Sequence, residues 1–120
     1  MTDLELVTEL IAKARAAQQE FETYSQEQVD KAVRAVGKVI YDHGDELAKM
    51  AVEETRMGDY ASKIVKNTAK AKAVWYRMKG VKSRGIIERD ELNGIIKVSK
   101  PIGVIGCIPP TTNPTMTPMH

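Results

Sequence analysis

Residues 101–120 read PIGVIGCIPPTTNPTMTPMH, and this segment constrains the architecture more than any other part of the chain. Its apolar part, residues 102–108, predicts a short buried strand in which Gly103 and Gly106 let another backbone approach closely. Two prolines then fix two φ angles and lead into a polar turn that contains Asn113. Open α/β sheets bind ligands where a strand ends in such a turn. The segment therefore predicts an α/β fold with its functional site at the carboxyl edge of this strand.

Residues 1–84 are predicted to form a cluster of helices. Apolar residues recur at helical spacing in four successive stretches, and we expect each stripe to pack in a core. Local signals set the helix boundaries. Thr2 with Glu5 and Ser25 with Gln28 have the spacing of capping boxes, which begin the first and second helices, and Gly44 is expected to end the second as a C-cap. The third helix is expected to be capped by Asp45 and to stop at Gly58, and the fourth to run over about 59–79.

The pattern of residue types changes after Gly80, where β-branched residues begin to alternate with polar ones. An Asn-Gly pair at residues 93–94 is a strong hairpin signal. We therefore predict a β-ribbon over 85–100 between the helical part at 1–84 and the strand and turn at 101–120.

Composition excludes several classes of protein. No apolar run approaches the roughly 20 residues that span a bilayer, and the N-terminus has no signal-peptide pattern, so a cytoplasmic location is expected. Cys107 is the single cysteine, which excludes a disulfide framework and a cysteine-based metal site; no metal is expected. We interpret Cys107 as a small core residue, and His43 and His120 have no pattern of catalytic partners.

The charge is distributed unevenly along the chain. Residues 1–59 hold 7 basic and 13 acidic side chains, whereas residues 60–87 hold 8 basic side chains and no acidic one. Such a block can meet a polyanion, or it can form a solvated helix face. One hypothesis is therefore a non-catalytic helical interaction module that uses the basic 60–87 face.

The turn itself offers hydroxyl and carboxamide groups, from Thr111, Thr112 and Asn113, beside two rigid prolines. None of these groups is a strong acid or base near pH 7, so hydrogen bonding and orientation are their natural roles. From the residues alone, these side chains could equally serve to satisfy nearby backbone groups.

The run KPIGVIG at 100–106, followed by PPTTNPT at 109–115, resembles the aldehyde dehydrogenase superfamily. The likeness is strongest to its CoA-acylating branch, including the aldehyde dehydrogenase half of bifunctional aldehyde–alcohol dehydrogenases. The segments SQEQVDKAVRAV, LAKMAVEETRMG and KIVKN are similar to the N-terminal helices of that family. The resemblance extends over nearly the whole chain.

The resemblance implies roles for individual residues. Asn113 would be the catalytic amide that stabilises the oxyanion after a cysteine thiolate attacks the aldehyde. The nicotinamide–ribose end of NAD would be lined by the neighbouring residues Ile108, Pro109, Pro110, Thr111, Thr112, Pro114, Thr115 and Met116. The acyl thioester left on the cysteine after hydride transfer to NAD would be resolved by coenzyme A.

The resemblance also implies that the chain is an N-terminal fragment of an oxidoreductase. Residues 1–84 would be the helical part of its NAD-binding domain, and residues 101–120 would be the first strand of that domain's sheet with the truncated active-site turn. The nucleophilic cysteine of the family lies far downstream of the asparagine, so the fragment alone is expected to be inactive. The substrate would be a short aldehyde, of the acetaldehyde or sulfoacetaldehyde type, and the sequence leaves open NAD or NADP. The 85–100 ribbon would pair with another subunit of a homo-oligomer, and neither nucleic acid nor a membrane is an expected partner.

Overall fold

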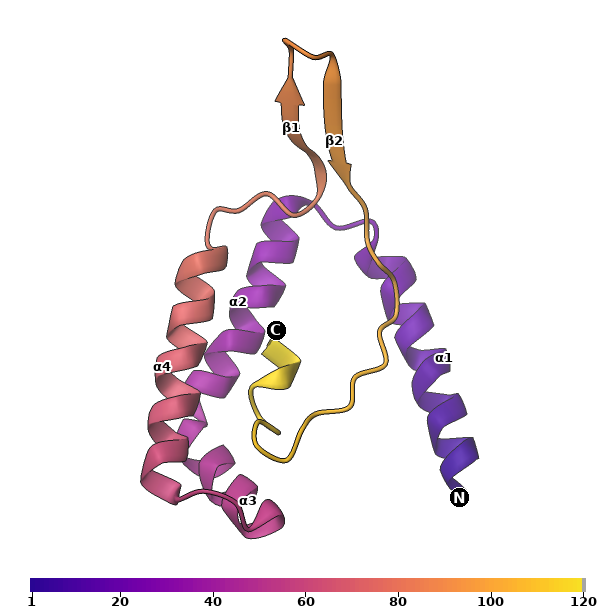
Figure 1. Ribbon diagram of the computed structural model, residues 1–120. Coiled ribbons are helices and arrows are strands. Elements are labelled where there is room, and N and C mark those ends of the chain that lie inside the picture. Colours follow the sequence, from indigo (N-terminus) through magenta and orange to yellow (C-terminus); the bar gives the residue numbers. More distant parts are fainter. Residues whose placement is uncertain (120) are drawn as a thin grey trace. The chain divides into compact units, whose positions relative to one another are not determined.

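The computed structural model describes residues 1–119, and His120 lies outside the described residues. Four helices precede a two-stranded ribbon and a short 3-10 helix (Figure 1). These elements are α1 (Asp3–Phe21), α2 (Gln26–Asp42), α3 (Gly44–Thr55), α4 (Tyr60–Met78), β1 (Gly85–Asp90), β2 (Ile95–Ser99) and η1 (Thr117–Met119). The chain divides into two compact units, one of residues 1–29 with 82–106 and the other of residues 30–81 with the described residues from 107 onward.

The two capping boxes in the first unit are confirmed. Thr2 Oγ1 accepts from the backbone N–H of Glu5 at 3.3 Å, while the Glu5 carboxylate accepts from the N–H of Thr2 at 2.7 Å. Ser25 and Gln28 make the same reciprocal pair at 3.3 and 2.8 Å. The prediction that the apolar stripe of α1 is core is not met within residues 1–119, where α1 has no buried residue.

The predicted ribbon is confirmed as an antiparallel pair, with Gly85 opposite Ser99 at one end and Asp90 opposite Ile95 at the other. A bulge interrupts the register between Ile86 and Glu88. Gly94 supplies the turn with a positive φ of 64°, the conformation for which glycine is favoured.

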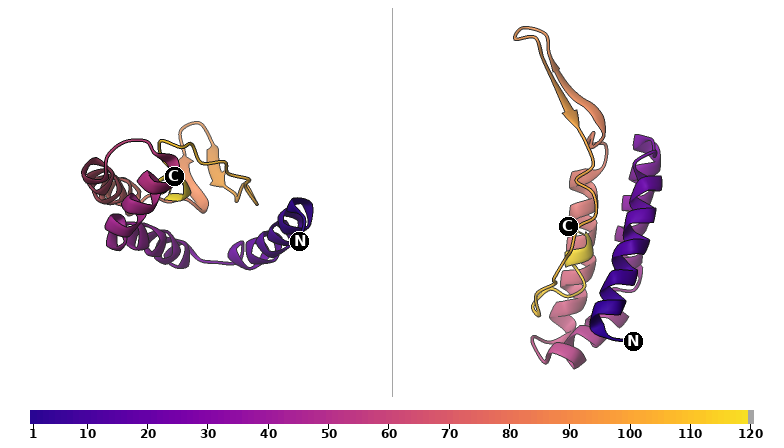
Figure 2. Two further views of the ribbon diagram at one scale, coloured as in Figure 1. Left: turned by 90° about the horizontal axis from the view of Figure 1, so that it is seen from below. Right: turned by 90° about the vertical axis from the view of Figure 1, so that its right-hand side faces the viewer.

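In the second unit, a small apolar core forms where the C-terminal segment meets two helices. Met116 and Met119 are buried against Ile40 of α2 and Ala71 of α4, and Trp75 packs at the edge of this cluster. The views agree in placing η1 alongside α2 and α4 (Figures 1 and 2). The polar turn that precedes Met116 is therefore tied to the helices by its own apolar neighbours.

The boundary between α2 and α3 differs from the prediction. Gly44 does not end α2 but begins α3, and Asp45 does not cap α3; its carboxylate instead accepts a hydrogen bond from the Tyr60 hydroxyl. A Cβ atom on Gly44 would lie 2.9 Å from Cγ2 of Thr68, so glycine permits a close approach of α3 to α4. A packing requirement, which local sequence does not reveal, therefore explains this glycine.

The predicted strand over 102–108 is wrong for this structure. These residues form no ladder, and Ile102 and Ile108 are 89% and 94% exposed. Cys107 is likewise exposed and not a core residue. A strand requires a neighbour with which to pair, and the described part of the chain supplies none for this segment. Nor does any helix among residues 1–119 have the length and apolar character needed to cross a membrane.

The core position of Met116 leads to the first prediction. Met116→Ala should lower the free energy of unfolding by about 2–5 kcal/mol, because a 2% exposed side chain is lost from a packed cluster. Met50→Ala is the control, since Met50 is 55% exposed on α3 and its loss should cost less than about 0.5 kcal/mol. Urea titration measures both values, and equal losses would show that the methionine cluster does not hold the C-terminal segment.

Candidate functional site

The backbone around Asn113 is fixed by hydrogen bonds on both sides. The N–H of Asn113 donates to the carbonyl oxygen of Pro110 at 3.0 Å, which closes a tight turn. The carbonyl oxygen of Asn113 accepts from the Thr117 hydroxyl at 2.8 Å, and the N–H of Thr117 approaches it at 3.4 Å. The backbone of Asn113 is therefore held in one conformation.

The side chain of Asn113 is held much less firmly than its backbone. Its amide nitrogen Nδ2 is 3.3 Å from the Thr112 hydroxyl, which is a long hydrogen bond. Its carbonyl oxygen Oδ1 is buried and has no hydrogen-bond partner among residues 1–119. An amide nitrogen carries two donor hydrogens, so at least one donor of this half-buried side chain remains for another group.

Helix α4 contacts the turn through side chains at i, i+3 and i+4, which lie on one face of a helix. Lys63 Nζ and Lys66 Nζ each donate to the carbonyl oxygen of Thr112 at 2.9 Å. Asn67 Oδ1 accepts from the Thr115 hydroxyl at 2.7 Å. The two ends of the segment that contains Asn113 are thus attached to the same helix.

Asn67 also connects the turn to the start of α3. Its Nδ2 donates to the carbonyl oxygen of Gly44 at 3.0 Å, and its side chain is only 1% exposed. Burial of a carboxamide is tolerated because both of its ends have partners. From the sequence, Lys63 and Lys66 were interpreted only as part of the basic 60–87 face and Asn67 was given no role, although the spacing of the three residues in KIVKN places them on one face of a helix.

The electrostatic environment of this contact is basic. Burial lowers the pKa of Lys66 below its ordinary value, and the charges of Lys63 and then Lys70 lower it further. Lys63 itself is 8% exposed, and neither Lys63 nor Lys66 has an ion-pair partner among residues 1–119. Because a buried ammonium group is costly unless it is hydrogen-bonded, the Thr112 carbonyl is an important partner for both lysines.

The residues predicted to line a cofactor lie in different environments. Ile108, Pro109, Pro110, Thr111 and Thr112 are exposed, while Pro114 and Thr115 are half-buried. Met116 is buried in the apolar core with Met119, Ile40 and Ala71, and this burial anchors the C-terminal side of the turn. Turns at 111–112 and 114–116 flank Asn113, and the contact of residues 108–112 and 114–116 with a cofactor stays a prediction.

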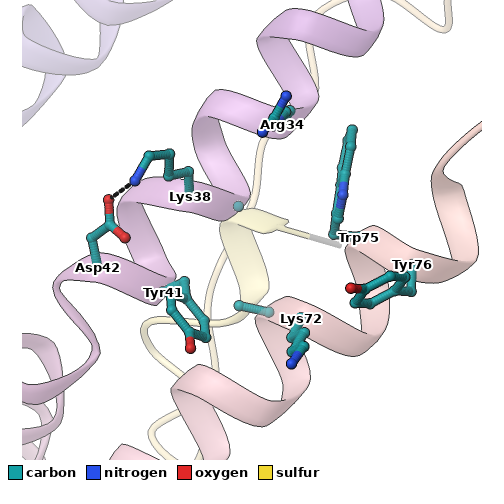
Figure 3. A pocket seen from close by; sticks show the side chains of 9 residues that line it. Arg34, Lys38, Tyr41, Asp42, Lys72, Trp75 and Tyr76 are labelled. Carbon is teal, nitrogen blue, oxygen red and sulfur yellow. Dashed lines mark hydrogen bonds and ion pairs between the residues drawn. The ribbon is translucent and has the colours of Figure 1, made fainter.

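A pocket of about 260 Å³ opens beside this turn at the start of α4, and Gly58, Ser62, Lys63 and Thr112 are among its lining residues. A second pocket, of about 330 Å³, lies between α2 and α4 (Figure 3). There the Arg34 guanidinium lies 6.0 Å from the centre of the Trp75 ring. Within residues 1–119, no three His, Cys, Asp or Glu side chains are grouped so that they could hold a metal ion.

Comparison with known proteins identifies the protein family of the chain. The sequence pattern of the aldehyde dehydrogenase family matches residues 1–120. The chain belongs to this family. The resemblance carried by KPIGVIG and PPTTNPT is therefore confirmed at the level of the family.

Relatives of the chain in this family include enzymes described as acylating or acetylating. The chain is 48% identical over 113 residues to a succinate-semialdehyde dehydrogenase (acetylating) of Clostridium kluyveri, and the match covers 94% of this chain and 25% of the relative. It is 46% identical over 116 residues to a sulfoacetaldehyde dehydrogenase (acylating) of Bilophila wadsworthia, covering 95% and 25% of the two chains. The chain thus spans about a quarter of the length of the curated relatives it matches.

A solved structure in the aldehyde dehydrogenase family has a similar fold. The crystal structure of an acetylating aldehyde dehydrogenase from Geobacillus thermoglucosidasius matches with a TM-score of 0.70 and 37% identity. The match covers 78% of this chain and 22% of that chain. About four fifths of this chain is therefore similar in fold to part of a larger aldehyde dehydrogenase.

The start of α4, which presents Lys63 to the turn, leads to a pH-dependent prediction. Asp59 caps this helix by accepting from the N–H of Ser62 at 2.9 Å, and this bond lowers the pKa of its carboxyl below the ordinary value of 3.8. The resulting stability is present above the unfolded pKa and is lost as the pH falls through the folded pKa. Asp59→Asn should keep a capping oxygen but weaken the loss of stability in this acid range.

Urea titrations at several pH values below 5 would measure this difference. Asp3→Asn is a suitable control because it removes an acidic side chain from the first turn of α1 instead. Acid sensitivity that is identical in the wild type and Asp59→Asn would contradict the assigned role of Asp59.

Proposed function

We propose that this chain is the N-terminal part of an NAD-dependent, CoA-acylating aldehyde dehydrogenase, which converts a short aldehyde to its acyl-CoA. Membership of the family and the acylating enzymes among its relatives support this proposal. The structural observation that carries it is the Asn113 amide, which has a fixed backbone and a donor that remains available. The cytoplasmic location expected from the sequence stays a prediction.

The proposed role of Asn113 is to donate a hydrogen bond to the aldehyde oxygen as negative charge develops on it. A donor on a fixed backbone needs less reorganisation when the charge appears, and it is stronger in a partly buried site than in water. Asn113 cannot exchange a proton near pH 7, so its contribution is electrostatic. The buried Oδ1 atom, which has no partner within residues 1–119, is available to accept a hydrogen bond that fixes the amide plane.

The turn also suits the cofactor that the family implies. NAD supplies the acceptor for the hydride that leaves the substrate carbon. The exposed hydroxyls of Thr111 and Thr112 stand beside Pro109 and Pro110, and neutral hydroxyls on a rigid backbone fit the hydroxyl groups of a ribose. We propose that residues 108–112, 114 and 115 line this end of the cofactor, whereas Met116, which the sequence also assigned to the cofactor, is buried in the core and supports these residues.

The nucleophile in this proposal is a cysteine outside residues 1–120, because the relatives are about four times as long as the match. The aldehyde is of the acetaldehyde or sulfoacetaldehyde type, and coenzyme A accepts the acyl group. The rival reading, a non-catalytic module with a basic 60–87 face, is less favoured, since Lys63 and Lys66 of that block are bound to Thr112.

The proposal predicts the effect of removing the amide. In the full-length protein, Asn113→Ala should lower kcat roughly 10²- to 10³-fold, as for the loss of an oxyanion donor in other enzymes. The measurement is NADH formation that requires both aldehyde and coenzyme A. Gln19→Ala is the control, because it removes an exposed carboxamide from α1.

Two results would contradict this proposal. The first is a full-length wild-type protein with no CoA-dependent NADH formation from any short aldehyde. The second is an Asn113→Ala variant that turns over as fast as Gln19→Ala, which would exclude the amide as a transition-state donor.

We further propose that the β1–β2 ribbon joins subunits of a homo-oligomer. An isolated two-stranded ribbon is marginal in water, and this one leaves Ile86, Ile96 and Val98 between 39% and 53% exposed. Paired positions place these apolar residues on one face of the ribbon, where Arg89 is the cross-strand partner of Ile96. Lys97 lies next to Ile96 on the other face, where it forms an ion pair with Glu88 at 2.8 Å.

This arrangement predicts that Ile96→Asp reduces the mass of the assembly, because a charge would be buried at the subunit contact. Light scattering coupled to size-exclusion chromatography of the full-length protein measures that mass. Lys97→Gln, on the opposite face beside its partner Glu88, should leave the mass unchanged. An unaltered assembly in Ile96→Asp would contradict a role for the apolar face of the ribbon.

A further inference from the structure

We propose that Lys63, Lys66 and Asn67 form a cradle on α4 that positions Asn113 for catalysis. The proposal deepens the proposed function, on which it rests, by assigning positioning residues to the same site. These three residues are not predicted to touch substrate or cofactor. They act through the backbone of the turn.

The first step concerns the peptide group that joins Thr112 to Asn113. Its carbonyl oxygen receives two ammonium donors, from Lys63 and Lys66, each at 2.9 Å. Its N–H donates to Pro110 O at 3.0 Å. Both polar ends of one peptide group are therefore bound, which prevents rotation of the plane that sets the direction of the Asn113 Cα–Cβ bond.

The second step concerns the other side of Asn113. The Thr115 hydroxyl donates to Asn67 Oδ1 at 2.7 Å, and Asn67 is itself anchored to the carbonyl oxygen of Gly44 at 3.0 Å. The turn is thus attached to α4 at residues 112 and 115, on either side of Asn113. Fixing both flanks restricts the position of the amide without occupying its donors.

The third step concerns the cost of the arrangement. Burying ammonium groups without an acidic partner is unfavourable, and surface positions on the same helix are available to lysine, as Lys70 shows. One hydrogen bond would be enough to satisfy the Thr112 carbonyl oxygen, but this oxygen receives two, both from charged donors. A requirement for one orientation of the peptide group between Thr112 and Asn113 during catalysis would explain why both lysines bind this oxygen.

The test uses the full-length protein with Lys63→Met and Lys66→Met, singly and together. Lys70→Met, on an exposed site of the same helix, is the control of equal charge change for each single variant, and Lys70→Met combined with Lys72→Met is the control for the double variant. In the double variant, hydrogen exchange of the amides of residues 113 and 117 should become faster. Its kcat should fall about 10- to 100-fold, the scale of a small misplacement of a catalytic group. Lys70→Met should change neither quantity.

A second set of variants distinguishes positioning from general support. In the Asn113→Ala background, the double lysine change should lower kcat by less than twofold, because the residue through which the lysines act is absent. Asn67→Asp, which keeps the acceptor for Thr115 but loses the donor to Gly44, should give an intermediate fall in kcat. If the double variant does not fold, the same comparisons are made with each single variant.

Several outcomes would overturn the cradle. Unchanged exchange at residues 113 and 117 in both lysine variants would show that these contacts do not fix the turn. A fall in kcat of equal size with and without Asn113 would show that the lysines act by another route. A wild-type protein without CoA-dependent turnover would refute the proposed function, while the exchange measurement would still decide whether the lysines hold the turn.

Discussion

The contact on which the second unit depends joins two ammonium groups to one carbonyl oxygen. Lys63 is buried, Lys66 is partly buried, and neither forms an ion pair among residues 1–119, so both need a hydrogen-bond partner, which the Thr112 carbonyl provides. The same bonds fix the peptide that precedes Asn113. Three residues beyond Asn113, Met116 enters the apolar core, so polar and apolar anchoring are combined in one short segment.

The features that sequence predicted well are local ones. The capping boxes at Thr2 and Ser25 and the hairpin at Asn93-Gly94 each involve residues within three positions of one another, so their signals are complete in the sequence. The strand expected over 102–108 failed because a strand depends on a partner. Gly44 was misinterpreted for a similar reason, since its small size serves contact with a helix that follows much later.

For the candidate site, sequence analysis found Asn113 but not the residues that surround it. The PTTNPT motif pointed to the asparagine directly. Lys63 and Lys66 were interpreted as part of a basic face, because lysine is rarely buried and their shared partner, Thr112, is 49 and 46 residues away. Contacts over such separations follow from tertiary packing, which no local pattern of charge or hydrophobicity specifies.

The same separation has a consequence for the order of folding. Bringing Thr112 to Lys63 closes a loop of about 50 residues, and the entropic cost of closure rises with loop length. The ribbon lies inside this loop and pairs Gly85 with Ser99, which shortens the free chain between the two contact points. Hairpins form in about 1–10 μs, ahead of most long-range contacts. Pairing of the ribbon strands therefore lowers the entropic cost of bringing the turn to α4, whichever of the two contacts forms first.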